Sequence, residues 1–195
     1  MKTITSFRKM LVVLPGAVLC YLLQACVMEN LTILGVTGSV IWAFLAVVVV
    51  SCGKKAAFCA AAITGMLTEA MLASVKGLYV ICIPVLTVAW AQVFADMTDR
   101  QRERRAVMGR GKRQDDLPAP LRIVLCAACM TASMNVIFLA YVYLSGVSLT
   151  FGHIGRALLN VVYTVGLAAL LMTPVRAALG MYRRPETRFK GGEML

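Results

Sequence analysis

The sequence predicts an all-α polytopic membrane protein with six transmembrane helices and with both termini in the cytoplasm. Three observations lead to this fold class. Of the 195 residues, 60% are hydrophobic and only 15% are charged, whereas about 25% charged residues is usual in soluble domains. The mean hydropathy is +0.80. The apolar residues also form long blocks without the period of a one-sided helix or strand, as expected of helices surrounded by lipid.

Six apolar blocks have the length of roughly 20 residues that crosses a bilayer as a helix. They are Met10–Met28, Leu31–Cys52, Ala56–Ser74, Leu78–Ala95, Leu121–Ser145 and Ala157–Leu179. Short breaks separate the first four, so we expect antiparallel hairpins there. The chain therefore divides into a cytoplasmic N-terminus (1–9), helices 1 to 4 (10–95), a basic cytoplasmic loop (96–120), helices 5 and 6 (121–179) and a cytoplasmic tail (180–195).

The basic residues predict the orientation, because Lys and Arg gather in the short cytoplasmic loops of membrane proteins. With the N-terminus inside, all 20 Lys and Arg except Lys76 and Arg156 fall on the cytoplasmic side. The loop carries a basic patch made of Arg100, Arg102, Arg104, Arg105, Arg110, Lys112 and Arg113. We attribute the net charge of +11 to this bias and to attraction to anionic membrane lipid.

Several functional classes are not favoured by the residues present. The loop arginines are not interleaved with aromatic residues on which bases stack, so we expect no nucleic-acid binding. Neither G-x-S-x-G, H-E-x-x-H nor a Walker loop occurs, and no second intramembrane carboxylate could assist Glu69 in acid–base chemistry. We therefore predict no catalytic residues. Cys126 and Cys129 form the only C-x-x-C, far from the sole histidine, His153, so we expect neither a metal nor a cofactor.

The start of the chain has some features of a secretion signal. Lys2, Arg8 and Lys9 precede an apolar run, as in a signal peptide, and residues 23–26 (Leu-Gln-Ala-Cys) approach a lipoprotein cleavage box. The run is longer than a usual signal core, and five more spans follow it. We predict an uncleaved first helix, with cleavage at Cys26 as the alternative.

The third span carries a stripe of very small side chains with one acid in it. Residues recurring every four positions share one helix face, and this face holds Ala57, Ala61, Gly65, Glu69 and Ala73. Small residues let helix backbones approach closely in a membrane, so we predict a buried helix–helix seam. A carboxylate at the bilayer centre costs about 2.5–3.5 kcal/mol. Glu69 therefore either reaches the membrane surface to pair with Lys76, or faces a cavity or a partner inside the bundle.

The sixth span has a polar stripe made of Arg156, Asn160, Tyr163 and Thr164. Asparagine in an apolar helix usually forms a hydrogen bond with another helix, so the stripe should face protein. Both this stripe and Glu69 lie in the outer halves of their spans. We therefore put forward the hypothesis that Glu69 contacts Arg156 or Asn160.

The order of these features resembles the MreD family of bacterial rod shape-determining membrane proteins. The resemblance covers Met10–Gly180 and is carried by Leu22-Leu23-Gln24, the turn Gly53-Lys54-Lys55, Phe58, residues 65–69, Lys76-Gly77-Leu78-Tyr79, and Asn160, Tyr163 and Pro174. The family commonly has G-L-x-x-D where this chain has Gly65 to Glu69, so glutamate replaces the usual aspartate. Gly38-Ser39 stands where the family often has Pro-Asn.

The resemblance implies a non-enzymatic scaffold of the cell-wall elongation machinery, the elongasome, in the bacterial cytoplasmic (inner) membrane. The implied partners are MreC, the filament protein MreB and the transpeptidase and glycosyltransferase that carry out peptidoglycan synthesis. The implied mechanism is docking of partner transmembrane helices, with the small-residue stripe as either an internal seam or the partner surface.

The alternative is a substrate-binding subunit of an energy-coupling-factor vitamin transporter, whose fold is thought to be similar to that of MreD. That alternative predicts an outward-facing polar pocket with aromatic residues. It also predicts an Ala-x-x-x-Ala motif on the first helix, whereas here the motif lies on the third, at Ala57 and Ala61.

Overall fold

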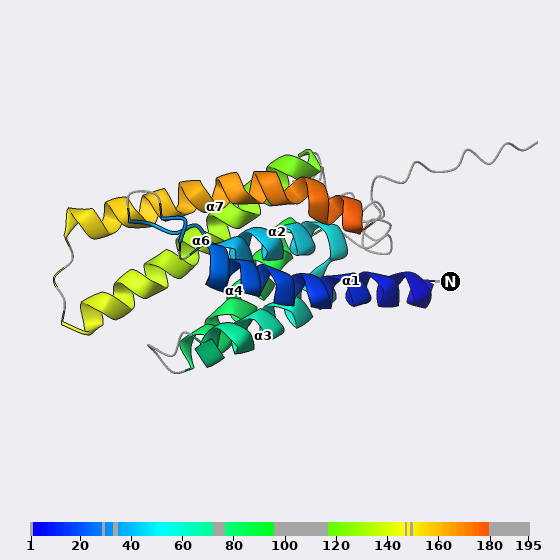
Figure 1. Cartoon of the computed structure of the whole chain (residues 1–195), viewed down its shortest axis with the longest axis horizontal. Helices are drawn as coiled ribbons and strands as arrows, with labels where there is room; N and C mark the ends of the chain where they lie inside the picture. The colour runs from blue at the N-terminus through cyan, green and yellow to red at the C-terminus, as the bar shows by residue number, and fades with distance from the viewer. Residues whose placement is uncertain are drawn as a thin grey trace, which may run out of the picture.

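The computed structural model describes residues 2–28, 30–32, 35–71, 77–95, 117–146, 148 and 150–179, with side chains from residue 10 onward except that of Met71. This part of the chain forms helices and no strand: α1 (Lys2–Leu23), continued by the π-helix η1 (Gln24–Met28), then α2 (Val40–Cys52), α3 (Lys54–Met71), α4 (Leu78–Phe94), α6 (Ala119–Leu144) and α7 (Phe151–Ala178) (Figure 1). The prediction of an all-α fold is confirmed.

Each predicted span overlaps with one helix, but several helix boundaries differ from the predicted ones. Helix α1 begins at Lys2, so the predicted cytoplasmic N-terminus is already helical. Helix α7 begins at Phe151, six residues before the predicted start, because Thr150 and His153 form a capping box there. The basic patch of the predicted loop and the predicted tail (180–195) lie outside the described residues.

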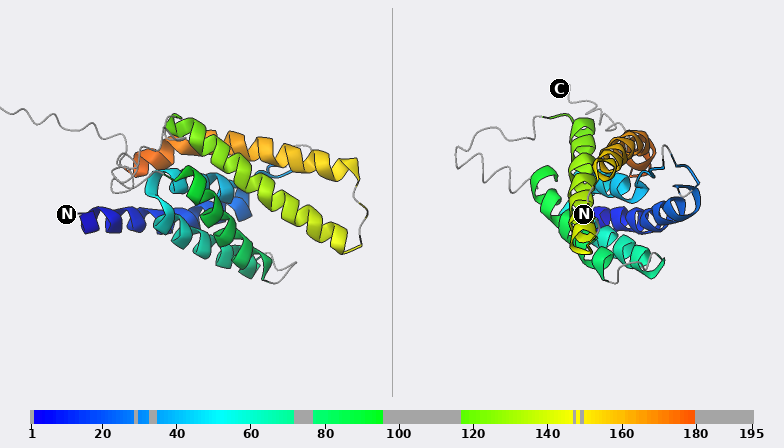
Figure 2. Two further views of the ribbon diagram at one scale, coloured as in Figure 1. Left: turned by 180° about the vertical axis from the view of Figure 1, so that it is seen from behind. Right: turned by 90° about the vertical axis from the view of Figure 1, so that its left-hand side faces the viewer.

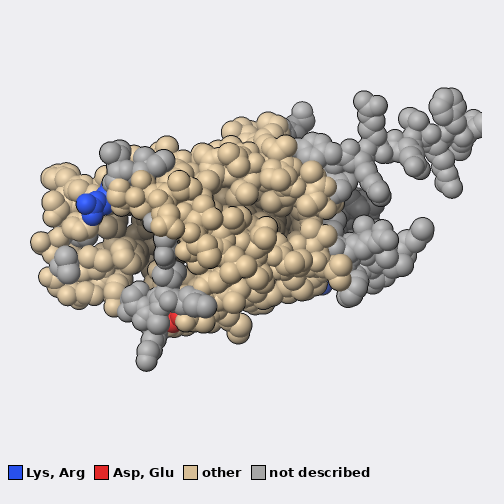
Figure 3. Space-filling model, in the orientation of Figure 1, with Lys and Arg blue, Asp and Glu red and all other residues tan. Residues whose placement is uncertain are grey.

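In the part of the chain that the structure describes, three helical stretches are long and apolar enough to cross a membrane: Met10–Met28, α6 and α7. Helices α2 and α4 are apolar but shorter, and α3 carries Lys54, Lys55 and Glu69 among its 18 residues. Charged side chains are rare on the described surface in the view of Figure 3. These features indicate a membrane protein.

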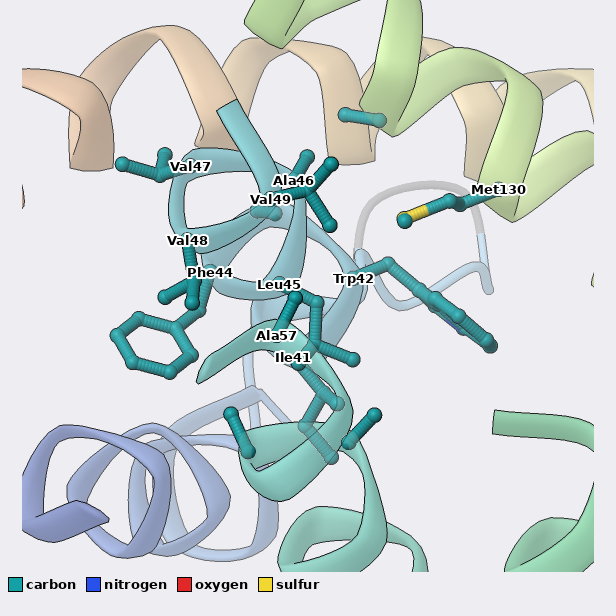
Figure 4. Packing of buried hydrophobic residues seen from close by; sticks show 14 of the residues in the cluster. Ile41, Trp42, Phe44, Leu45, Ala46, Val47, Val48, Val49, Ala57 and Met130 are labelled. Atoms are coloured by element: carbon teal, nitrogen blue, oxygen red, sulfur yellow. The ribbon is translucent and has the colours of Figure 1, made fainter. Parts of the chain in front are cut away.

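Helix α2 is the centre of the bundle. Its residues from Val40 to Val50 are all buried, and within the described part of the chain it packs against α1, α3, α4, α6 and α7. Figure 4 shows its side chains pointing outward on every side, with Ala57 of α3 and Met130 of α6 among their neighbours. The apolar block that predicted a lipid-exposed span is thus apolar all round because protein surrounds it.

The start of α2 is the largest difference from the predicted boundaries. The prediction began this span at Leu31, but the helix begins at Val40, and residues 35–39 contain no helical turn. We call residues 35–39 the lead-in segment. The 13 residues of α2 rise about 20 Å at 1.5 Å each, so α2 by itself is shorter than a hydrocarbon core of about 30 Å.

Successive helices run in opposite directions, so the bundle has two ends. Helix α1 begins and α7 finishes at one of them, which we call the termini end (Figures 1 and 2). The turn between α2 and α3 lies there too and consists of Gly53, whose φ of +82° favours glycine. At the opposite, distal end, α6 and α7 diverge.

Candidate functional site

Glu69 caps the N-terminus of the neighbouring helix α4. The backbone N–H of Gly77 donates to its Oε1, and the N–H of Tyr79 donates to its Oε2 at 3.1 Å. The first N–H groups of a helix have no partner within the helix, and the helix dipole favours a negative charge at that point. Gly77 itself provides no side-chain cap. One half-buried carboxylate therefore completes α4 and ties it to α3.

The small-residue stripe of α3 is an internal seam. A Cβ on Gly65 would lie 3.1 Å from the carbonyl oxygen of Tyr79, so glycine lets α3 and α4 touch through their backbones. Ala57 and Ala61 are fully buried in the core. Ala73 lies outside the described residues. The described stripe is thus covered by this chain itself and is not open to a partner helix.

The predicted contact of Glu69 with Arg156 or Asn160 is wrong. Glu69 serves α4, whereas the Nδ2 of Asn160 donates to the carbonyl oxygen of Thr37 at 2.6 Å. Helix α3 packs mainly on α4, α1 and α2, which leaves α7 out of its reach. The backbone N–H groups at the start of α4, the next helix in the chain, bind the carboxylate of Glu69 instead. The alternative pairing with Lys76 lies outside the described residues.

The polar stripe of α7 holds the lead-in segment. Besides the contact from Asn160, the Oγ1 of Thr164 accepts a hydrogen bond from the Ser39 N–H at 3.0 Å. The hydroxyl of Tyr163 donates to the carbonyl oxygen of Leu31 at 3.4 Å. Non-helical backbone at membrane depth is tolerated only where its polar groups find partners in the protein. Asn160, Tyr163 and Thr164 therefore face protein and supply these partners, whereas Arg156 is exposed.

Gln24 completes this support from the other side, and the sequence interpretation missed it. Its Nε2 donates to the Gly38 carbonyl oxygen at 3.3 Å, and its Oε1 accepts from the Val40 N–H at 2.7 Å. Gly38 has no room for a side chain, because a Cβ there would lie 2.8 Å from Leu167. An amide at the end of an apolar helix was the signal that could have identified this role.

A cavity of about 300 Å³ opens at the distal end between the lead-in segment, α6 and α7. We call it the distal pocket. Its polar lining consists of Thr37, Asn135, His153, Arg156 and Asn160, and its apolar lining includes Val36, Phe138, Leu139 and Val142. The Nδ2 of Asn135 donates to the Ala157 carbonyl oxygen at 3.0 Å, which links α6 to α7. Arg156 and Asn160 of the predicted stripe thus line a cavity, whereas Tyr163 does not.

Thr150 and His153 fix the orientation of the imidazole at the rim of the distal pocket. The Thr150 N–H donates to Nδ1 of His153 at 3.2 Å. A neutral imidazole that accepts at Nδ1 carries its proton on Nε2. His153 therefore offers a hydrogen-bond donor to the distal pocket.

A second cavity is an apolar groove of about 250 Å³ between α1 and α7, with α2 as its floor. We call it the α1–α7 groove. Its walls are Val12, Val13, Gly16, Leu19, Cys20 and Leu23 on one side and Leu171, Pro174, Val175, Ala178 and Leu179 on the other, and Phe44 and Val48 form the floor. Both walls pack on α2 but not closely on each other. The sequence interpretation missed this groove because its two walls belong to the first and the last helix, which are far apart in the sequence.

The described residues contain no cluster of three or more His, Cys, Asp and Glu side chains that could hold a metal ion. Cys126 is buried in α6 and Cys129 is partly buried. Comparisons with protein-family models, with curated proteins and with solved structures gave no match to this chain.

Proposed function

We propose that this chain is a non-enzymatic membrane scaffold of the MreD type that docks a partner transmembrane helix in the α1–α7 groove. The observation that carries the proposal is the groove itself. Two helices wall it, a third forms its floor, and its lining is apolar apart from the thiol of Cys20. Helices associate in membranes largely by close packing of such surfaces. The small-residue stripe of α3 is covered, so the groove replaces it as the docking surface.

The residues that carry the family resemblance have architectural roles, which supports a scaffold. Gln24 and Asn160 hold the lead-in segment, and Gly65 and Glu69 form the joint between α3 and α4. Ser39 accepts from the Trp42 N–H at 3.5 Å as the N-cap of α2. Serine and asparagine are both preferred N-caps, so Ser39 can do the work of the family's asparagine.

The proposed topology has six spans in the bacterial inner membrane, with both termini in the cytoplasm. Lys54, Lys55, Arg122 and Arg176 all lie near helix ends at the termini end, as the cytoplasmic bias of basic residues predicts. Residues 96–116 join helices whose neighbouring ends, Phe94 and Ala119, also lie at this end. In this arrangement the basic patch faces anionic lipid and MreB, and the groove receives the membrane helix of MreC.

Depletion of the protein tests the proposal, with cell shape and recovery of MreC as the two readouts. Wild-type protein should restore rods and co-purify MreC. Leu19→Trp, which fills the groove, should round the cells and lower MreC recovery. Leu22→Trp is the matched control, because Leu22 is similarly exposed on the same helix (51% against 60%) but does not line the groove. Normal cell shape after depletion would contradict the scaffold.

The distal pocket favours a second candidate, the substrate-binding subunit of an energy-coupling-factor vitamin transporter. It is a polar pocket with one aromatic side chain, Phe138, at the end opposite the termini. Concave sites with a few polar groups in an apolar lining are typical of small-molecule binding. Loss of vitamin uptake on depletion, with rods retained, is the result that this candidate predicts.

A further inference from the structure

We propose that the distal pocket and the adjoining face of α6 and α7 bind an anionic phospholipid, with its phosphate at Arg156 and His153 and an acyl chain between the two helices. This site is independent of the α1–α7 groove, so the proposal stands whether or not the scaffold function is correct. A phosphate could also belong to a soluble molecule, but the apolar groove beside the distal pocket selects a lipid.

The polar groups at the rim of the distal pocket suit an anion. Arg156 offers guanidinium N–H groups that match phosphate oxygens, and the capping contact with Thr150 leaves the Nε2 of neutral His153 as a donor. Among the described residues the sole acidic side chain is Glu69, whose carboxylate caps α4. Arg156 therefore has no carboxylate partner in the described part of the protein.

A third cavity lies against the distal pocket. It measures about 180 Å³ and is lined by Ala132, Asn135, Val136, Leu139, Ile154, Ala157, Leu158 and Val161. We call it the seam groove. It shares Asn135, Leu139 and Ala157 with the distal pocket, so the two cavities flank the same seam between α6 and α7. Figure 3 shows the surface hollowed at this end of the molecule.

The seam groove is built for an alkyl chain. Apart from Asn135, whose amide binds the Ala157 carbonyl oxygen, its lining is apolar. Val136 and Leu158 on its two sides are 65% and 63% exposed. An acyl chain would cover them, whereas a small soluble anion in the distal pocket would leave them bare. The polar pocket beside an apolar groove therefore selects an amphiphile.

The depth of Arg156 agrees with a lipid phosphate. Helix α7 has 28 residues and is about 42 Å long at 1.5 Å per residue, which exceeds a hydrocarbon core of about 30 Å. Arg156 lies five residues, or about 8 Å, from the start of α7 at Phe151. This places its guanidinium near the headgroups, with Leu158 and Val161 deeper among the acyl chains.

Photo-crosslinking in lipid nanodiscs tests the site directly. The full chain is placed in phosphatidylcholine discs with a small fraction of phosphatidylglycerol that carries a diazirine on its acyl chain. We expect crosslinks on the α6 and α7 peptides that contain Val136 and Leu158. Arg156→Gln should lower this labelling about fivefold, the effect of one basic residue at an anionic membrane surface. Lys55→Gln, at an exposed lysine of the termini end, should leave it unchanged.

Two further variants separate charge, shape and folding. Arg156→Lys keeps the charge and should retain most of the labelling, and Val136→Trp should block the chain without altering any charge. Each variant is used only if it elutes as a single species in size-exclusion chromatography. Equal labelling by a phosphatidylcholine analogue, or labelling that Arg156→Gln and Val136→Trp leave unchanged, would show ordinary annular lipid and overturn the proposal. Competition by soluble glycerol phosphate as strong as that by unlabelled phosphatidylglycerol would also overturn it.

Discussion

The backbone N–H of Tyr79 donates to Oε2 of Glu69 across 3.1 Å, and this contact joins the end of α3 to the start of α4. The hydrogen bond satisfies a polar group on each of the two helices. A carboxylate within an apolar helix needs donors, and the first turn of the next helix needs acceptors. Because each meets the need of the other, Glu69 needs no catalytic role to account for its position.

Removal of this cap should destabilise the protein. Glu69→Ala leaves the N–H groups of Gly77 and Tyr79 without their acceptor, and loss of a partner by a buried polar group costs about 1–3 kcal/mol. Glu69→Gln keeps one acceptor oxygen and loses the charge that favours the helix N-terminus, so a smaller loss is expected. The measurement is the Tm in detergent. An unchanged Tm for Glu69→Ala would contradict the cap.

A side chain at Gly65 should force α3 and α4 apart. The new Cβ of Gly65→Ala would lie 3.1 Å from the backbone oxygen of Tyr79, and overpacking of this kind costs about 1–3 kcal/mol. The matched control is Gly166→Ala in α7, where a Cβ meets nothing within 4 Å. Thermal unfolding should show a lower Tm for Gly65→Ala only, and equal behaviour of the two variants would refute the close approach.

Support of the lead-in segment should depend on the hydroxyl of Thr164. Thr164→Val keeps the shape of the side chain but removes the acceptor of the Ser39 N–H, which should cost about 1–3 kcal/mol. Thr87→Val is the control, because the equally buried Thr87 hydroxyl only donates to the Ile83 carbonyl oxygen in its own helix. The Tm in detergent should fall more for Thr164→Val than for Thr87→Val. The reverse order would contradict the role of Thr164 in holding the lead-in segment.

The two polar positions, Glu69 and Asn160, should act independently. They bind different elements, α4 and the lead-in segment, and distant sites usually add within about 0.3–0.5 kcal/mol. The double variant Glu69→Ala/Asn160→Ala should therefore lose the sum of the two single losses of unfolding free energy. A coupling well above that range would revive a direct contact between them.

The orientation can be checked with a membrane-impermeant thiol reagent on a cysteine-free background. Leu144 is 82% exposed at the distal end of α6, so Leu144→Cys should react in intact cells. Lys55 is exposed at the termini end, so Lys55→Cys should react only after the cells are permeabilised. The reverse pattern would show that the termini face outward.

The sequence predicted the helices well where composition changes sharply, and poorly where it does not. The breaks at Gly53 and Gly77 mark real helix ends. Residues 31–39 carry no charge and include four large apolar side chains, so their length and composition included them in the helix that follows. In the structure the lead-in segment is held by contacts from Gln24 and Thr164, which belong to other elements. Its two glycines, Gly35 and Gly38, and the N-cap Ser39 were the local signals of a helix start at Val40.

The candidate sites divide in the same way. The stripes of α3 and α7 were predicted to face protein, which follows from spacing and polarity, but the partner proposed for Glu69 was wrong. A hydrogen-bond partner depends on which helices are neighbours, and spacing within one helix does not give that. The three cavities were missed for the same reason, because each lies between different helices. The structure shows that α6 and α7 share a polar surface, because the Nδ2 of Asn135 donates to the Oδ1 of Asn160 at 3.5 Å.

The lead-in segment also has a consequence for biogenesis. Ser39 and Thr37 are held by Thr164 and Asn160, which follow them by 125 and 123 residues in the chain. During synthesis the ribosome therefore completes the innermost helix when Gln24 is present but long before Asn160 and Thr164 exist. The core of this bundle reaches its final form only when the last helix has entered the membrane, and a chain truncated before α7 would lack a finished centre.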